Sequence, residues 1–152
     1  MAPRPRILVA GLAPVMRDVR EALAADAETI SAESFQEAQR RLEEETPQAV
    51  VVAYHFDEIQ PFRFIRCLRQ DARFDSVPLL LVRILPVNLG ATEAEVRQAY
   101  QDLGASEFFD LYERTRRLGA QAALDELRGC LRAMLGIGID PTQRRSPCAR
   151  KC

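Results

Sequence analysis

The side chains able to do acid–base or nucleophilic chemistry are few in this sequence. Among its 152 residues there is one histidine, His55, and one lysine, Lys151, which lies near the C-terminal end. A P-loop ATPase, a Schiff-base enzyme or a lysine phosphate clamp needs a lysine inside the fold, so these classes are excluded. No serine or cysteine stands in a context typical of a histidine-activated nucleophile. We therefore expect no catalytic residues and no enzyme activity.

Four cysteines offer the other candidate chemistry, which is metal binding. A zinc site typically needs two close pairs of ligands at set spacing, and this sequence has no CxxC pair and a single histidine. Cys67 and Cys130 fall on apolar faces of expected helices, where a cysteine is commonly a small core residue. We expect all four, including Cys148 and Cys152, to be thiols, and we expect no metal and no cofactor.

The elements that must position these residues alternate between short apolar runs and amphipathic segments. Residues 49–53 (AVVVA) and 78–82 (PLLLV) are apolar on both faces, as parallel strands covered by helices are. Apolar spacing of three and four indicates helices, and Ser34-x-x-Glu37 and Thr92-x-x-Glu95 are capping-box patterns. The sequence predicts strands near residues 6–10, 28–31, 49–53, 78–82 and 106–109, and helices near 14–25, 34–45, 61–70, 92–103 and 120–135.

This alternation predicts an α/β fold, with a single doubly wound domain of five parallel strands and helices on both faces. Residues 1–135 carry 17 basic and 21 acidic side chains, a net charge of −4, whereas residues 136–152 carry a net +3. A folded part that is mildly acidic lacks the basic face of a nucleic-acid binder, so we do not expect a nucleic-acid partner. No apolar run approaches the roughly 18–20 residues of a membrane helix. We expect no membrane partner and a cytoplasmic location.

Three stretches, in this order, resemble the receiver domain of bacterial two-component response regulators. Residues 7–23 (ILVAGLAPVMRDVREAL) are similar to the family's opening strand and helix. Residues 47–78 (PQAVVVAYHFDEIQPFRFIRCLRQDARFDSVP) have its ungapped register of third strand, loop, third helix and fourth strand, and residues 104–109 (GASEFF) are similar to its turn into strand five. The resemblance covers about residues 5–135 and implies a flavodoxin-like (βα)5 fold with strand order 2-1-3-4-5.

The residues that carry the family's phosphorelay chemistry are missing from the matching positions. An active receiver binds Mg²⁺ through acidic side chains and accepts phosphate on an aspartate, and a Ser/Thr and a lysine contact the phosphate. The resemblance places the acidic pair at Gly11 and Leu12, the phospho-acceptor at Ala53, the Ser/Thr at Arg83 and the lysine at Leu111. It therefore implies a degenerate pseudo-receiver that cannot be phosphorylated in the family's way.

Charged residues remain around this degenerate phospho-pocket. Asp57 and Glu58 follow Ala53 by four and five residues, and Arg83 ends the fourth strand. One interpretation is an ion pair at the pocket rim between Arg83 and Asp57 or Glu58. The guanidinium would then fill the space that phosphate occupies in an active receiver. The other is solvated loop charges, each pair contributing about 0–1 kcal/mol. The basic cluster at residues 114–117 (RTRR) is expected to form a solvated rim.

Two functions remain open. The first is a stand-alone regulator that binds another signalling protein, or a second copy of itself, without phosphorylation. By the resemblance, its interaction face is formed by helix four, strand five and the last helix, with Arg97, Tyr100, Gln101, Glu107 and Phe108. Tyr100 also fits a core role, because it shares a helical face with Val96 and Leu103.

The second function is small-molecule sensing in an apolar pocket at the carboxyl ends of the strands, formed by Gly11, Leu12, Ala53 and Tyr54. In either case, residues 1–135 form the receiver-like domain, and residues 136–152 are expected to be a flexible basic tail. We expect no attached DNA-binding domain, because the tail is too short to form one.

Overall fold

Five parallel strands form the centre of the molecule in the computed structural model, which describes residues 4–54, 56, 61–86 and 90–136. The strands are β1 (Arg6–Ala10), β2 (Glu28–Ala32), β3 (Ala49–Ala53), β4 (Leu79–Arg83) and β5 (Glu107–Asp110). Their order in the sheet is β2-β1-β3-β4-β5, and every neighbouring pair is parallel. The predicted strand order and fold class are confirmed.

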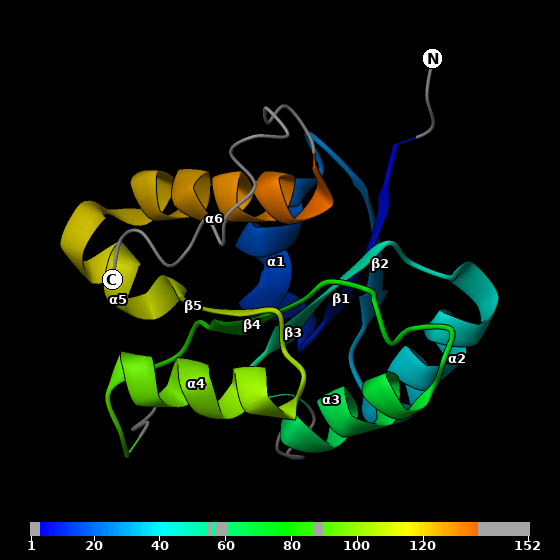
Figure 1. Ribbon diagram of the computed structural model, residues 1–152. Helices are drawn as coiled ribbons and strands as arrows, with labels where there is room; N and C mark the ends of the chain where they lie inside the picture. The colour runs from blue at the N-terminus through cyan, green and yellow to red at the C-terminus, as the bar shows by residue number, and fades with distance from the viewer. Residues whose placement is uncertain (1–3, 55, 57–60, 87–89, 137–152) are drawn as a thin grey trace.

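Helices cover both faces of this sheet (Figure 1). They are α1 (Ala13–Leu23), α2 (Phe35–Glu45), α3 (Pro61–Gln70), α4 (Glu93–Leu103), α5 (Leu111–Leu118) and α6 (Ala120–Leu135). Helices α1 and α6 pack on one face, and α2, α3 and α4 pack on the other. The bounds predicted for α3 and α6 agree with the structure.

The core consists of two apolar layers separated by the sheet. Along β3, Val50 and Val52 belong to the layer under α2, α3 and α4, whereas Val51 and Ala53 belong to the layer under α1 and α6. All five residues of β3 are buried, which explains why this strand is apolar throughout. Full burial of an aliphatic side chain of this size contributes about 1.5–3 kcal/mol. The sheet therefore fixes the positions of the residues that follow its carboxyl ends.

The two predicted capping sites form to different extents. At α4 the Thr92 hydroxyl accepts from the Glu95 N–H at 3.2 Å, and the Glu95 carboxylate accepts from the Thr92 N–H at 3.0 Å. This is the complete reciprocal pattern of a capping box. At α2 the Ser34 hydroxyl accepts from the Glu37 N–H at 3.1 Å, but the Glu37 carboxylate accepts from the N–H of Glu33. Ser34 is therefore the N-cap of α2, but the second hydrogen bond of the capping box joins Glu37 to Glu33 instead of to Ser34.

Helix α5 was not predicted. The Asp110 carboxylate caps it by accepting from the Glu113 N–H at 3.0 Å, and Gly119 ends it with a φ of +89°. Both signals stand in the sequence as an Asp-x-x-Glu pattern and a glycine nine residues after the cap. The intervening residues are mostly polar, so apolar periodicity alone gave no indication of this helix.

Two expectations about the cysteines are wrong. Cys67 is a free cysteine, but it is exposed on α3 and does not belong to the core. Cys130 is buried in α6 as expected, but it forms a disulfide and is not a thiol. Of the expected tail at residues 136–152, only Gly136, the C-cap of α6, lies within the described residues. None of the described helices is long and apolar enough to cross a membrane.

Candidate functional site

The degenerate phospho-pocket positions lie at the carboxyl ends of β1, β3, β4 and β5, and an apolar side chain fills their centre. A Cβ added to Gly11 would lie 3.0 Å from the Ala53 Cβ and 2.6 Å from the Met16 Cγ. Met16 comes from α1 and is 1% exposed, and Ala53 is 4% exposed. The space between the ends of β1 and β3 is therefore packed. A side chain added at Gly11 would displace Met16.

The remaining apolar positions of this pocket are also unsuited to binding an ion. Leu12 is 53% exposed at the start of α1 and makes no side-chain cap. Leu111, at the position of the family's lysine, is buried in the apolar layer with α1 and α6. At Gly11, one of the residues of the small-molecule pocket that the sequence predicts, Met16 leaves no room for an added side chain.

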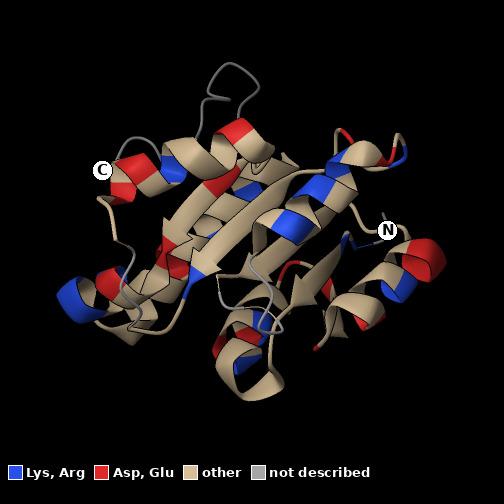
Figure 2. Cartoon of the chain, turned by 90° about the horizontal axis from the view of Figure 1, so that it is seen from below, with Lys and Arg blue, Asp and Glu red and all other residues tan. Residues whose placement is uncertain are grey.

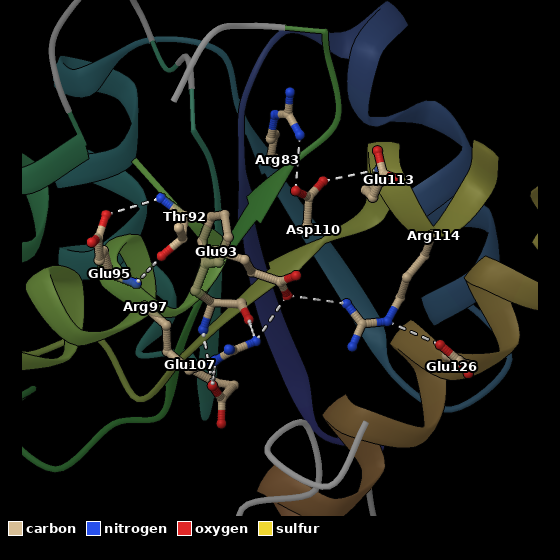
Figure 3. Close-up of polar contacts among 11 residues, drawn as sticks. Arg83, Thr92, Glu93, Glu95, Arg97, Glu107, Asp110, Glu113, Arg114 and Glu126 are labelled. Atoms are coloured by element: carbon tan, nitrogen blue, oxygen red, sulfur yellow. Dashed lines mark hydrogen bonds and ion pairs between the residues drawn. The ribbon is translucent and has the colours of Figure 1, made fainter. Parts of the chain in front are cut away.

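Arg83 forms an ion pair with Asp110 across the ends of β4 and β5 (Figure 3). These residues are register partners in the sheet; the Arg83 Nη1 donates to the Asp110 Oδ2 at 2.8 Å. Their side chains are 13% and 4% exposed. The Arg83 guanidinium also lies 5.0 Å from the centre of the Tyr112 ring. The partners that the sequence suggested, Asp57 and Glu58, lie outside the described residues.

An aromatic cluster lies on the α4 side of the sheet. The rings of Tyr54 and Tyr100 meet edge to face at 5.9 Å, and those of Tyr54 and Phe108 at 6.3 Å. Tyr100 and Phe108 are both buried. Burial raises the pKa of the Tyr100 hydroxyl above its usual range, and the neighbouring Tyr54 raises it further. Phe108 is thus held inside the core.

A chain of ion pairs connects β5, α4, α5 and α6 (Figure 3). Arg97 donates to the buried Glu107 at 2.8 Å and to Glu93 at 3.0 Å. Glu93 lies 3.6 Å from the Arg114 guanidinium, which also donates to Glu126 at 3.0 Å. Because its members come from four elements, this chain ties the two helical layers together around the edge strand β5.

Arg114 is buried at the centre of that chain. Its side chain is 3% exposed, and its guanidinium lies 4.2 Å from the centre of the Phe109 ring. The prediction that residues 114–117 form a solvated rim is wrong for Arg114, although Arg116 and Arg117 are exposed. Helix α5 causes the difference, because its first turn follows β5 directly and places Arg114 between α4 and α6.

The five residues predicted for the interaction face are mostly internal. Tyr100, Glu107 and Phe108 are buried, Arg97 is held by its two carboxylate partners, and Gln101 is half-buried. The exposed positions of this face lie on the outer side of α4, at Ala94, Glu95, Gln98, Ala99 and Asp102. Sequence periodicity places Tyr100 equally well in a core or an interface, and the structure places it in the core.

Metal binding has no evident location within the ranges that the structure describes. These residues contain no group of three or more histidine, cysteine, aspartate or glutamate side chains that could hold a metal ion. Mg²⁺ requires oxygen ligands, usually carboxylates, to replace part of its water shell. At the position where the family holds its metal, the side chain nearest to Gly11 is the thioether of Met16.

Comparison with solved structures identifies the fold as that of response-regulator receiver domains. The phosphorylated cyanobacterial phytochrome response regulator RcpA superposes with a TM-score of 0.68 at 14% identity, over 91% of this chain and 99% of RcpA. The chemotaxis response regulator CheY4 of Vibrio cholerae gives 0.64 at 16%, over 84% and 98%. A sensor protein from Polaromonas sp. JS666 gives 0.61 at 22%, over 82% and 99%. No family model and no curated protein sequence matches this chain.

Proposed function

We propose that this protein is a pseudo-receiver that regulates signal transduction by binding another signalling protein, independently of phosphorylation. The observation that carries the proposal is the packing of Met16 against Gly11 and Ala53, where an active receiver needs its metal ligands and its phospho-acceptor. Methyl and thioether groups neither bind Mg²⁺ nor accept a phosphoryl group. The described residues at the positions of the metal ligands and the phospho-acceptor therefore supply no group that could take up phosphate.

The state of the edge strand supports the same proposal. In the receiver family, the aromatic residue that matches Phe108 turns inward when a Ser/Thr moves toward the bound phosphate. Here Phe108 is already inside the core, and Arg83 occupies the Ser/Thr position in an ion pair with Asp110. Burial of Phe108 and the Arg83–Asp110 ion pair support a regulatory surface that does not depend on phosphorylation.

The surface available for a partner on this side is the outer face of α4, together with the neighbouring α3. Figure 2 shows arginines and no acidic residues along α3, whereas α4 is mainly acidic. Arg63 and Arg66 of α3 are exposed, and so are Glu95 and Asp102 of α4. Adjacent stripes of opposite charge favour one orientation of a docked protein and affect its association rate more than its affinity. A second copy of this chain is one candidate partner.

Partner capture with matched surface variants tests this function. Ala99 is exposed on the outer side of α4, and Gln36 is exposed on α2. We expect Ala99→Arg to abolish capture of a specific signalling protein from source lysate and Gln36→Arg to retain it. Capture by the native protein should be equal with and without acetyl phosphate and Mg²⁺. Capture that requires the phosphate donor, or that both variants retain, would contradict the proposal.

A further inference from the structure

We propose that the pocket between α1, α5 and α6 is a binding site for a small amphiphilic cation, such as an amine that carries one aromatic ring. This inference goes beyond the proposed function, because it does not depend on a protein partner or on the α4 surface. The site also differs from the small-molecule pocket that the sequence predicts, which lies at Gly11 and Ala53.

Aliphatic side chains form most of the pocket wall. The pocket has a volume of about 170 Å³, and its lining residues are Val15, Asp18, Val19, Ile84, Leu111, Tyr112, Thr115, Ala120 and Leu124. Leu85, next to Ile84 in the chain, is a large exposed apolar residue, as is Leu118, one helical turn after Thr115. An apolar wall that opens to solvent loses unfavourable hydration when an apolar group covers it.

The pocket exists because of helix α5. Leu111, Tyr112 and Thr115 all lie on this helix, which the regular alternation of five strands and five helices does not include. Asp110 fixes the start of α5 through its cap, and the ion pair of Asp110 with Arg83 fixes the cap in turn. One wall of the pocket is therefore held by contacts within the protein and is formed before any ligand binds.

The size of the pocket limits the ligand. An engineered protein cavity of about 150 Å³ with apolar walls holds a benzene molecule. A pocket of about 170 Å³ therefore accepts one six-membered ring or a branched chain of similar size. A bicyclic or steroid ligand would extend far into solvent, and so would a long acyl chain.

Polar groups in the lining select the other end of the ligand. Asp18 is the charged residue among the lining residues, and it accompanies the hydroxyl groups of Tyr112 and Thr115. The Asp18 side chain is 66% exposed and lies 3.7 Å from the Arg17 guanidinium, a solvent-exposed pair that contributes little. A carboxylate accepts hydrogen bonds and attracts cations, so an ammonium group at the pocket mouth is preferred over a carboxylate.

Three probes that share a phenethyl group and differ in their polar end test the site in the full-length protein: phenethylamine, 2-phenylethanol and 3-phenylpropionate. We expect phenethylamine to shift the amide resonances of residues in α1, α5 and α6 in a saturable titration. The alcohol should bind more weakly, and the carboxylate should bind weakest. Asp18→Asn should reduce the preference of the amine over the alcohol by up to about fivefold, the upper range for an exposed charge pair.

Two alanines at the start of α6 provide a matched pair of variants. Ala120 lines the pocket, whereas Ala122 is exposed and does not. Ala120→Leu should weaken binding of all three probes at least tenfold, and Ala122→Leu should bind them as the native protein does. The proposal is overturned if no probe shifts the amide resonances of the lining residues, or if 3-phenylpropionate binds tightest. It is also overturned if these resonances shift with protein concentration in the absence of a probe. The last result would assign the pocket to a second copy of the chain.

Discussion

Arg83 and Asp110 face each other at the carboxyl ends of β4 and β5, joined by a hydrogen bond of 2.8 Å between two nearly buried side chains. In the receiver family the position of Arg83 holds the Ser/Thr that contacts phosphate. Here the Arg83 guanidinium and the Asp110 carboxylate form an ion pair in that region. The Asp110 carboxylate also caps α5, because it accepts a hydrogen bond from the Glu113 N–H. This single pair therefore links the degenerate phospho-pocket to the helix that forms the neighbouring pocket.

Removal of Arg83 should be costly. Arg83→Ala leaves the buried Asp110 carboxylate without this cation, and we expect the free energy of unfolding to fall by about 2–4 kcal/mol. The matched control is Arg116→Ala. Arg116 is 65% exposed and lies 3.4 Å from Glu113, so its loss should cost about 0–1 kcal/mol. Urea denaturation followed by circular dichroism measures both values, and equal losses would show that the Arg83–Asp110 pair has no special role.

Restoring an aspartate at the acceptor position should destabilise the protein without restoring the chemistry. Ala53→Asp places a carboxylate in the buried apolar layer that also contains Met16, where burial disfavours the charged form. We expect a loss of about 2–5 kcal/mol in the free energy of unfolding. Ala53→Ser, which is smaller than aspartate and uncharged, should cost less. An Ala53→Asp variant as stable as the native protein would mean that the pocket is more open than its packing indicates.

Tyr100 should make the stability of the protein depend on pH in the alkaline range. Burial raises the pKa of its hydroxyl above the unfolded value of about 10, so the folded state binds this proton more tightly. The associated stability is complete below pH 10 and is lost as the pH rises from there toward the folded-state pKa, by up to about 1.4 kcal/mol per pH unit. Tyr100→Phe removes this titration. Between pH 10 and pH 12 the urea midpoint of the native protein should fall relative to that of Tyr100→Phe, and a constant difference across that range would contradict the assignment.

Arg114 should behave as a core residue despite its charge. Arg114→Met leaves Glu93 and Glu126 with one cation fewer and removes the contact with Phe109. We expect a loss of about 2–4 kcal/mol in the free energy of unfolding. Arg117→Met, three residues further along α5 on an exposed position, should change stability by less than about 0.5 kcal/mol. Thermal denaturation separates the two, and an inverted order would mean that α5 does not pack as described.

Elements with strong local signals could be predicted from the sequence. Helix α3 begins at a proline and has a regular apolar face at Phe64, Ile65 and Leu68, and its bounds agree with the prediction. Strand β3 is apolar at every position because both of its faces are covered. In such elements the signal that sets the structure lies within a few neighbouring residues.

Contacts between distant residues could not be predicted in the same way. The pairing of Arg83 with Asp110 depends on the register of β4 against β5, which 27 positions in the chain separate. The burial of Arg114 depends on α5, whose mostly polar composition hides its core-facing side. The close approach of Met16 to Gly11 depends on how α1 packs beside the end of β1, and helical spacing alone assigns Met16 only to a core face. These features arise from tertiary packing rather than from local sequence.

Phosphate incorporation tests the central claim most directly. The native protein is incubated with acetyl phosphate and Mg²⁺ beside an active receiver domain, and the intact mass of both is measured. We predict that the active receiver gains the mass of one phosphoryl group and that this protein gains none, because apolar side chains occupy the positions of the acceptor and the metal ligands. An acid-labile phosphoryl group on this protein would contradict the account.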